Sequence, residues 1–234
     1  DQELENAASN QACDCAPDGE ASPVANTGPQ IKAGAEVQEK NFVFKSGGFT
    51  KVSYYSEAPI KDIVGINQDV SGQLRVDIND PNRLAEGGVV LKMAGFSTGI
   101  PLRDEHFRAE KWLDTERYPD AEFKITKVET KNRIEFGKVA NGTIHGTMRL
   151  KEHTYNLEVP ITARYLEATE ELQKMRIKTN LLVVEGTFSL DLTPLKLSGM
   201  KNSGGKKIAK VLKVRLKLAG SEQAPVASSP TLIP

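Results

Sequence analysis

The three histidines and two cysteines of this chain are the residues best suited to metal or nucleophilic chemistry. Cys13 and Cys15 are separated by one residue, so a disulfide bond between them would close a strained, reducible ring that constrains almost none of the chain. Two exposed thiols are the alternative. A metal site would need two further ligands, and no histidine lies near this pair in the sequence. We therefore expect no metal site and no built-in cofactor.

The histidines differ in their surroundings. His145 and His153 flank a predicted hairpin, and we expect both at the surface. A third histidine belongs to a stripe of residues at helical spacing, Leu102, His106, Ala109 and Leu113. For it three roles stay open: a half-buried histidine bonded to a carbonyl or carboxylate, a polar group at the head of a ligand, or a catalytic or metal-binding residue.

The catalytic role lacks partners in the sequence. The chain contains no phosphate loop, dinucleotide-binding glycine pattern, H-E-x-x-H or G-x-S-x-G. A role of His106 and Asp104 in catalysis would require a convergent nucleophile or metal, for which no candidate is found. We therefore expect a protein that is not an enzyme and has no catalytic residue.

The stripe belongs to a predicted helix that begins near Pro101 and ends before Pro119. Proline is tolerated in a first helical turn, and the residue before a proline resists the helical conformation, so both limits have a physical cause. Asp104 and Arg108 are spaced to form an ion pair on the solvent-facing side. The stripe on the other side is predicted to face the core.

Most of the remaining chain alternates between apolar and polar residues. The alternating apolar positions include Leu74, Val76 and Ile78; Phe123 and Ile125; Tyr155, Leu157, Val159 and Ile161; Phe188, Leu190 and Leu192; and Leu212, Val214, Leu216 and Leu218. One apolar face per strand is typical of antiparallel sheets. Seven or eight such strands predict a closed barrel or a sandwich. Pro160 interrupts one of them and favours an edge position or a bulge there.

Composition sets the domain limits and excludes some partners. Residues 1–40 and 221–234 have few large apolar side chains and are predicted to be flexible tails around one domain at 41–220. The 31 basic residues balance the 31 acidic ones, so we expect no nucleic-acid partner. No apolar run is long enough to cross a membrane as a helix. The N-terminus shows no leader, which fits a cytoplasmic chain or an exported one numbered from its mature end.

A basic tract runs from Lys206 and Lys207 through Lys210, Lys213, Arg215 and Lys217. On a strand, charged residues at alternate positions all lie on the outer face, where water solvates them. A local patch for anionic lipid head groups or for a protein partner is the alternative interpretation.

The segment TGIPLRDEHFRAEKWLDTERYPDAEFKIT, residues 98–126, resembles the signature of the YceI-like family. The matching positions are Thr98, Asp104, His106, Phe107, Asp114, Tyr118, Pro119 and Phe123. Residues 142–161 and 185–200 are similar to further segments of the family, and the resemblance covers about residues 48–219. The N-terminal tail and the Gly/Lys-rich segment at 195–207 depart from the family pattern.

The resemblance implies an all-β, lipocalin-like antiparallel barrel of about eight strands with one short helix. It also implies an exported, periplasmic bacterial protein, its signal peptide removed, that holds a polyisoprenoid or another long amphiphile in the lumen. The inward residues are then the predicted ligand-binding wall: Leu74, Val76, Leu91, Met93, His106, Phe107, Trp112, Phe123, Ile125, Tyr155, Leu157, Val159, Phe188, Leu190, Leu212 and Val214. The alternative is a non-catalytic accessory subunit of an envelope assembly, with protein partners bound through residues 1–40 and 221–234.

Overall fold

A computed structural model describes residues 30–31, 34–58, 62–174, 177–202 and 208–223. Cys13, Cys15 and most of both predicted tails lie outside the described residues. The elements are β1 (Glu39–Phe44), β2 (Lys51–Ser56), β3 (Ile63–Asn67), β4 (Val70–Asp77), β5 (Ala85–Lys92), α1 (Pro101–Arg108), β6 (Asp120–Thr130), β7 (Val139–Leu150), β8 (His153–Leu166), α2 (Glu170–Lys174), β9 (Leu181–Asp191), α3 (Ser198–Asn202) and β10 (Val211–Gln223). The predicted limits at 41 and 220 therefore cut into the first and last strands.

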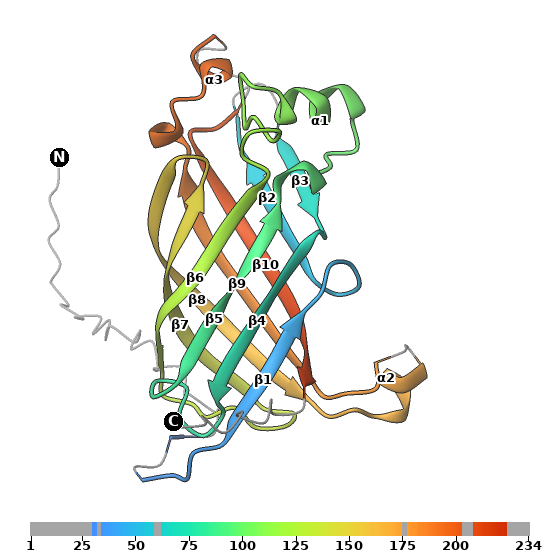
Figure 1. Cartoon of the computed structure of the whole chain (residues 1–234), viewed down its shortest axis with the longest axis vertical. Helices are drawn as coiled ribbons and strands as arrows, with labels where there is room; N and C mark the ends of the chain where they lie inside the picture. Colours follow the sequence, from blue (N-terminus) through green and yellow to red (C-terminus); the bar gives the residue numbers. More distant parts are fainter. Residues whose placement is uncertain (1–29, 32–33, 59–61, 175–176, 203–207, 224–234) are drawn as a thin grey trace, which may run out of the picture.

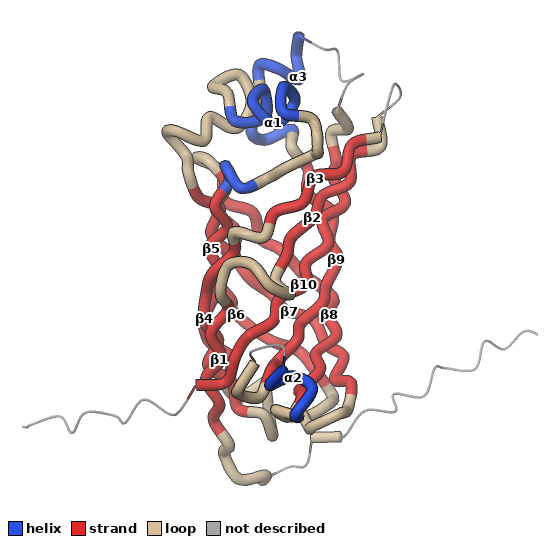
Figure 2. Tube along the Cα trace, turned by 90° about the vertical axis from the view of Figure 1, so that its right-hand side faces the viewer, coloured by secondary structure: helices blue, strands red, loops and turns tan. Residues whose placement is uncertain are grey.

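Eight of these strands form a closed antiparallel barrel, in the order β1-β4-β5-β6-β7-β8-β9-β10, and β10 returns to pair with β1 (Figure 1). The predicted all-β, lipocalin-like barrel is confirmed. Besides the one helix expected, the described residues include two single-turn α-helices, α2 and α3, and two 3-10 helices, η1 (Met93–Gly95) and η2 (Thr193–Leu195). Both views place α1 and α3 at one end of the barrel, which we call the lid end, and α2 at the other, the base end (Figure 2).

Strand β10 closes the barrel by pairing with two strands along the same edge. Its residues 220–223 pair with β1, and its residues 213–217 pair with β2. The turn between β1 and β2 contains Gly47 and Gly48, which have φ angles of 83° and 61° that glycine adopts without strain. Beside β10, the β2–β3 hairpin thus forms the wall nearer the lid end, and β1 forms the wall nearer the base end.

The ladder between β8 and β9 is shorter than its neighbours. Among the described residues it runs from the pair Ile161–Gly186 to the pair Leu166–Leu181, whereas β8 pairs with β7 from His153 onward. Pro160 thus lies where β8 is paired on one side only, as its missing N–H requires. The predicted edge position of Pro160 is confirmed. Toward the lid end the two strands separate, and Tyr155 Oη donates a hydrogen bond of 2.9 Å to the Asp191 carbonyl oxygen across the separation.

The helix at the lid end is shorter than predicted, because α1 ends at Arg108 rather than before Pro119. Phe107, Trp112 and Leu113 explain the difference. On a continuous helix these residues would be spread around the axis, so only some of them would face the barrel. The chain leaves the helix at Ala109 and turns back, so that Leu113 is buried and Phe107 and Trp112 contact the same cluster. The predicted restart of a strand after Pro119 is confirmed by β6.

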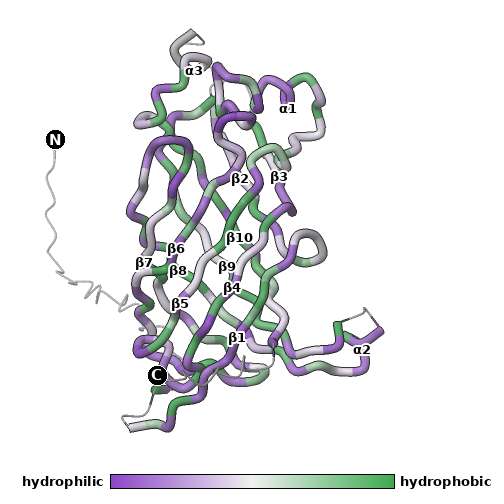
Figure 3. The backbone as a smooth tube through the Cα atoms, in the orientation of Figure 1, coloured by the Kyte–Doolittle hydropathy of each residue, from purple (hydrophilic) through white to green (hydrophobic). Residues whose placement is uncertain are grey.

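The interior of the barrel is apolar along its length, and hydropathy alternates along the strands (Figure 3). At the base end, Phe42, Tyr165 and Leu182 belong to a buried apolar cluster, beside which a cavity of only about 50 Å³ remains. Phe136, from the β6–β7 loop, stacks on Tyr165 with ring centroids 4.1 Å apart. Glu222 accepts hydrogen bonds from Tyr165, Asn180 and Lys40, which satisfies the carboxylate at the rim of this end. The base end is therefore filled by the protein's own side chains.

Asp77 connects β4 to the loops at the base end and is completely buried. Its carboxylate accepts hydrogen bonds from the backbone N–H groups of Gln38 and Asn79, and from the guanidinium of Arg83. Burial by itself raises the pKa of Asp77, but these hydrogen bonds and the Arg83 charge outweigh it and hold the pKa below its ordinary value. The folded state thus favours the ionised carboxylate.

Replacing Asp77 with alanine should lower the free energy of unfolding by ~3 kcal/mol at neutral pH, because the substitution leaves buried N–H donors without an acceptor. The contribution of the carboxylate is complete above its ordinary pKa of 3.8 and is lost as the pH falls below that value, through the lower folded pKa. Urea unfolding should therefore show a difference between wild type and D77A that shrinks in acid.

Glu86→Ala is the matched control, since Glu86 pairs with Arg75 at the surface and its side chain is 65% exposed. This substitution should change stability by at most about 0.5 kcal/mol. Equal effects of the two substitutions would contradict the role assigned to Asp77.

Candidate functional site

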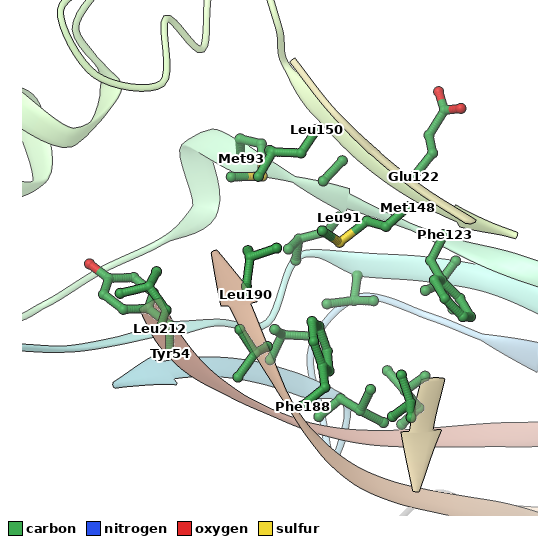
Figure 4. Close-up of a pocket in the computed structure, with 18 of the residues that line it drawn as sticks. Tyr54, Leu91, Met93, Glu122, Phe123, Met148, Leu150, Phe188, Leu190 and Leu212 are labelled. Carbon is green, nitrogen blue, oxygen red and sulfur yellow. The ribbon is translucent and has the colours of Figure 1, made fainter. Parts of the chain in front are cut away.

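A cavity of about 190 Å³ occupies the lumen between the middle of the barrel and the lid end (Figure 4). Among the described residues around it, all are aliphatic, aromatic, methionine or glycine except Gln73 and Glu122. These two belong to outward-facing positions, and Figure 4 shows Glu122 pointing away from the cavity. The cavity offers dispersion contacts and burial from water, and few hydrogen-bonding groups.

Most of the predicted wall residues surround this cavity. Those that line it are Leu74, Leu91, Met93, Phe107, Trp112, Phe123, Ile125, Val159, Phe188, Leu190, Leu212 and Val214. Val76 lies deeper, beside a second cavity of about 50 Å³ near the base end. Tyr155 and Leu157 contact the apolar cluster without lining the main cavity. Their contact with a ligand stays a prediction.

His106 does not face the lumen, so the predicted orientation of its stripe is wrong. His106 and Ala109 are exposed, and 62% of the surface of Leu102 is accessible; of the four stripe residues only Leu113 is buried. The inward face of α1 instead carries Asp104 and Phe107, three positions apart. The helix is placed by the hydrogen bonds of Asp104, which the apolar pattern did not include.

Several residues that line the cavity were not among the predicted wall residues, among them Phe44, Tyr54, Val70, Val89, Phe96 and Met148. Tyr54, Phe96 and Phe107 form an aromatic group beneath α1, with ring centroids 5.2 to 5.9 Å apart. Burial raises the pKa of Tyr54 to about 12, so its hydroxyl is neutral at physiological pH. The alternation in β2, with Val52 and Tyr54 facing inward, was the available signal for this group.

Asp104 attaches the lid helix to the segment that follows β5. It accepts hydrogen bonds from the Ser97 hydroxyl at 2.9 Å, from the Thr98 N–H at 2.8 Å and from the Thr98 hydroxyl. Arg103 completes the arrangement by donating to the Thr98 hydroxyl and carbonyl oxygens. Burial raises the pKa of Asp104, but these hydrogen bonds and the Arg108 charge outweigh it and lower the pKa. The predicted solvent-facing Asp104–Arg108 pair is therefore wrong, because the carboxylate is buried.

A second contact fixes the lid to the segment before β10. The indole of Trp112 packs on Gly199 so closely that a Cβ at this glycine would lie 2.4 Å from the ring. Lys151 donates a hydrogen bond of 3.0 Å to the Trp112 carbonyl oxygen, and the Gly199 N–H donates to the carbonyl of Lys111. Trp112 and Leu197 thus cover the lumen at this end from two different segments.

The other two histidines, His145 and His153, do not line the cavity. His145 lies on the outer wall between Glu129 and Glu158, at 3.5 and 3.7 Å, and His153 contacts the edge of the Tyr155 ring. No group of three His, Cys, Asp or Glu side chains that could hold a metal ion occurs among the described residues. Within the same residues, no helix is long and apolar enough to cross a membrane.

Comparison with known proteins places this barrel in one family. The YceI-like domain matches residues 40–219, which is most of the chain, and the chain therefore belongs to the YceI-like family. A curated relative, UPF0312 protein plu2095 of Photorhabdus laumondii, is 32% identical over 69 residues, or 29% of this chain. This alignment spans about a third of the relative, 34% of its length.

Solved structures share the fold at low identity. BcnA of Burkholderia cenocepacia matches with a TM-score of 0.57 at 16% identity, over 73% of this chain and 95% of its own. The YceI protein of Campylobacter jejuni matches with a TM-score of 0.55 at 14% identity, over 72% and 90%. A polyisoprenoid-binding domain from Saccharophagus degradans matches with a TM-score of 0.53 at 13% identity, over 80% and 100%. The barrel is thus a fold shared with proteins that include a polyisoprenoid-binding domain.

Asp104→Ala should loosen the lid while leaving the barrel folded, because it removes the acceptor shared by Ser97 and Thr98. Losing these hydrogen bonds should speed amide hydrogen exchange in residues 97–108 by about thirtyfold, corresponding to ~2 kcal/mol. Mass-spectrometric hydrogen exchange measures this. Glu105→Ala, at an exposed neighbouring position, is the control and should leave the exchange unchanged. A lid unaffected by D104A would show that the lid is held mainly by its apolar contacts.

Proposed function

We propose that this protein binds a long apolar chain, such as a polyisoprenoid or another amphiphile, in the lumen of its barrel, without a chemical reaction. The observation that supports the proposal is the wall of the cavity. The inward-facing residues that line it are apolar on every strand that contributes to it. Membership in the YceI-like family and the likeness to a polyisoprenoid-binding domain support it.

The cavity suits such a ligand energetically. About ten methylene groups transferred from water would contribute roughly 8 kcal/mol, at about 0.8 kcal/mol each. This value corresponds to a Kd of about 1 µM before the entropic cost of ordering the chain is subtracted. The filled base end and the enclosed lid end leave the middle of the lumen as the site for the chain. Binding therefore needs no catalytic group, and the proposal assigns none.

Filling the cavity should abolish binding. Val214 is 6% exposed and lines the lumen, so Val214→Trp should weaken binding of geranylgeraniol at least tenfold, because the indole takes the place of the chain. Native mass spectrometry and displacement of a fluorescent naphthylamine dye measure the binding. Val139→Trp is the control, since Val139 is 37% exposed on a strand facing outward, and it should bind like wild type.

A milder change keeps the test informative if V214W does not fold. Val214→Thr preserves the shape and adds one hydroxyl to the wall, which should cost binding about tenfold or less. Thermal unfolding confirms that each variant is folded before binding is measured. Wild-type protein that binds no geranylgeraniol, or a V214W variant that binds it normally, would refute the lumen as the site.

We further propose that the protein acts outside the cytoplasm, in the bacterial envelope. A carrier for a long apolar chain is useful where such a chain must cross an aqueous space between membranes. Cell fractionation of the native bacterium, with an antibody raised against residues 41–220, should place the protein in the periplasmic or secreted fraction. Recovery with the cytosol would refute the proposed location. The alternative of an accessory subunit depends on the tails, most of which lie outside the described residues.

A further inference from the structure

The outer wall of the barrel carries a groove of about 780 Å³ that is centred on β8, β9, β10 and β2 and reaches β7 and β3 at its sides. These strands lie side by side in the sheet (Figure 2). The groove lies outside the lumen and, unlike it, is lined by polar as well as apolar side chains. Its basic residues, Lys51, Arg215 and Lys217, include part of the basic tract seen in the sequence.

The register of the strands arranges these cations among hydroxyl groups. Arg215 of β10 lies between Thr187 of β9 and Ser53 of β2. Lys217, two residues along, lies between Glu185 and Lys51 in the next outward-facing row. The Ser53 hydroxyl is buried and donates to the Arg215 carbonyl oxygen, while Thr162 and Thr187 also line the groove. Cationic side chains beside such hydroxyl groups form the kind of surface that binds a phosphate group.

The groove has a net positive charge. Glu185 is its only acidic residue among those described, against three cations, and it accepts an ion pair of 2.9 Å from Lys217. The pKa of Glu185 is lowered mainly by the hydrogen bond from Lys217, with further contributions from the charges of Arg164 and Arg215. Within the described residues Arg215 forms no ion pair and remains available to an anion.

Groove and lumen share part of their wall. Ile161 and Leu216 line both the groove and the main cavity. Between them in the same cross-strand row lies Gly186, and methyl groups of Ile161 and Val159 cover the place of its missing side chain. A Cβ there would lie 3.0 Å from methyl carbons of both Ile161 and Val159. The β8–β9 ladder begins at this row, so beyond it no ladder pairing joins the two strands in the described structure.

We propose that this groove binds the phosphate head group of a long-chain alcohol phosphate whose apolar chain lies in the lumen and passes between β8 and β9 beside Gly186. The inference rests on the proposed lumen binding and adds the chemical class of the ligand. The lumen accounts for the chain but has few polar groups for a head group. The groove provides cations and hydroxyls beside the row at which the β8–β9 ladder begins. A single molecule with an apolar chain and an anionic head group would match both the apolar lumen and the cationic groove.

The test compares two ligands with the same chain, geranylgeranyl monophosphate and geranylgeraniol, by displacement of the naphthylamine dye. Wild-type protein should bind the phosphate at least about tenfold more tightly than the alcohol. The double variant Arg215→Gln, Lys217→Gln should lose this advantage and bind the alcohol unchanged. Inorganic phosphate should compete only weakly, since most of the affinity comes from the chain.

A matched control lies on the opposite side of the ring, on β6. Lys124→Gln, Lys127→Gln removes one exposed lysine and one that is paired with Glu129, as the test variant removes Arg215 and the Glu185-paired Lys217. It should leave the binding of both ligands unchanged. An equal loss of phosphate binding in this control would indicate a general charge effect and overturn the groove assignment.

The outcomes separate the two proposals. If neither ligand displaces the dye, the lumen function itself fails. If both bind equally in wild type, or if the phosphate advantage survives in the Arg215/Lys217 variant, the lumen function stands and the groove proposal is overturned. Strong competition by inorganic phosphate would show a site for a free anion rather than for a lipid head group, and would also overturn the proposal.

Discussion

The pairing of β10 with both β1 and β2 is the constraint on which the rest of the structure depends. Without it the eight strands would form an open sheet with two exposed edges and an apolar face in contact with water. With it, the inward residues of every strand share one compartment. Val214 and Phe123, from strands on opposite sides of the ring, thereby line the same cavity. The apolar lumen follows directly from closure combined with strand alternation.

Closure also explains why the two ends of the barrel differ. Below the β1–β2 turn, β1 pairs with β10, and Phe42 and Tyr165 belong to the apolar cluster of the interior. Toward the lid end, the β2–β3 hairpin replaces β1 beside β10, and β8 separates from β9. The main cavity, of about 190 Å³, lies toward this end. The aromatic residues Phe107 and Trp112, brought in by the α1 segment, supply its cover.

Polar groups are restricted to the ends and the outer wall, and the most deeply buried carboxylates have several partners. Asp77 at the base end and Asp104 at the lid end each accept hydrogen bonds from backbone and side-chain donors. Such buried networks hold the loops around the lumen in fixed positions. The lumen between them presents an apolar wall to the proposed ligand. The head-group site that we propose lies on the outer surface, in the groove over Gly186, which has a net positive charge.

The sequence by itself determined the class of fold and most of the lumen wall, because a strand with one buried face must alternate and its inward residues can be read directly. Leu74, Phe188 and Val214 were identified in this way. Only the tertiary structure decided the orientation of α1. Asp104 is buried and its carboxylate accepts hydrogen bonds, whereas His106 is exposed, which is the reverse of what the apolar pattern predicted. The tertiary structure also decided which strands pair, and hence where the β8–β9 ladder stops at Gly186. Pairing depends on contacts between residues distant in the chain, which local periodicity does not record.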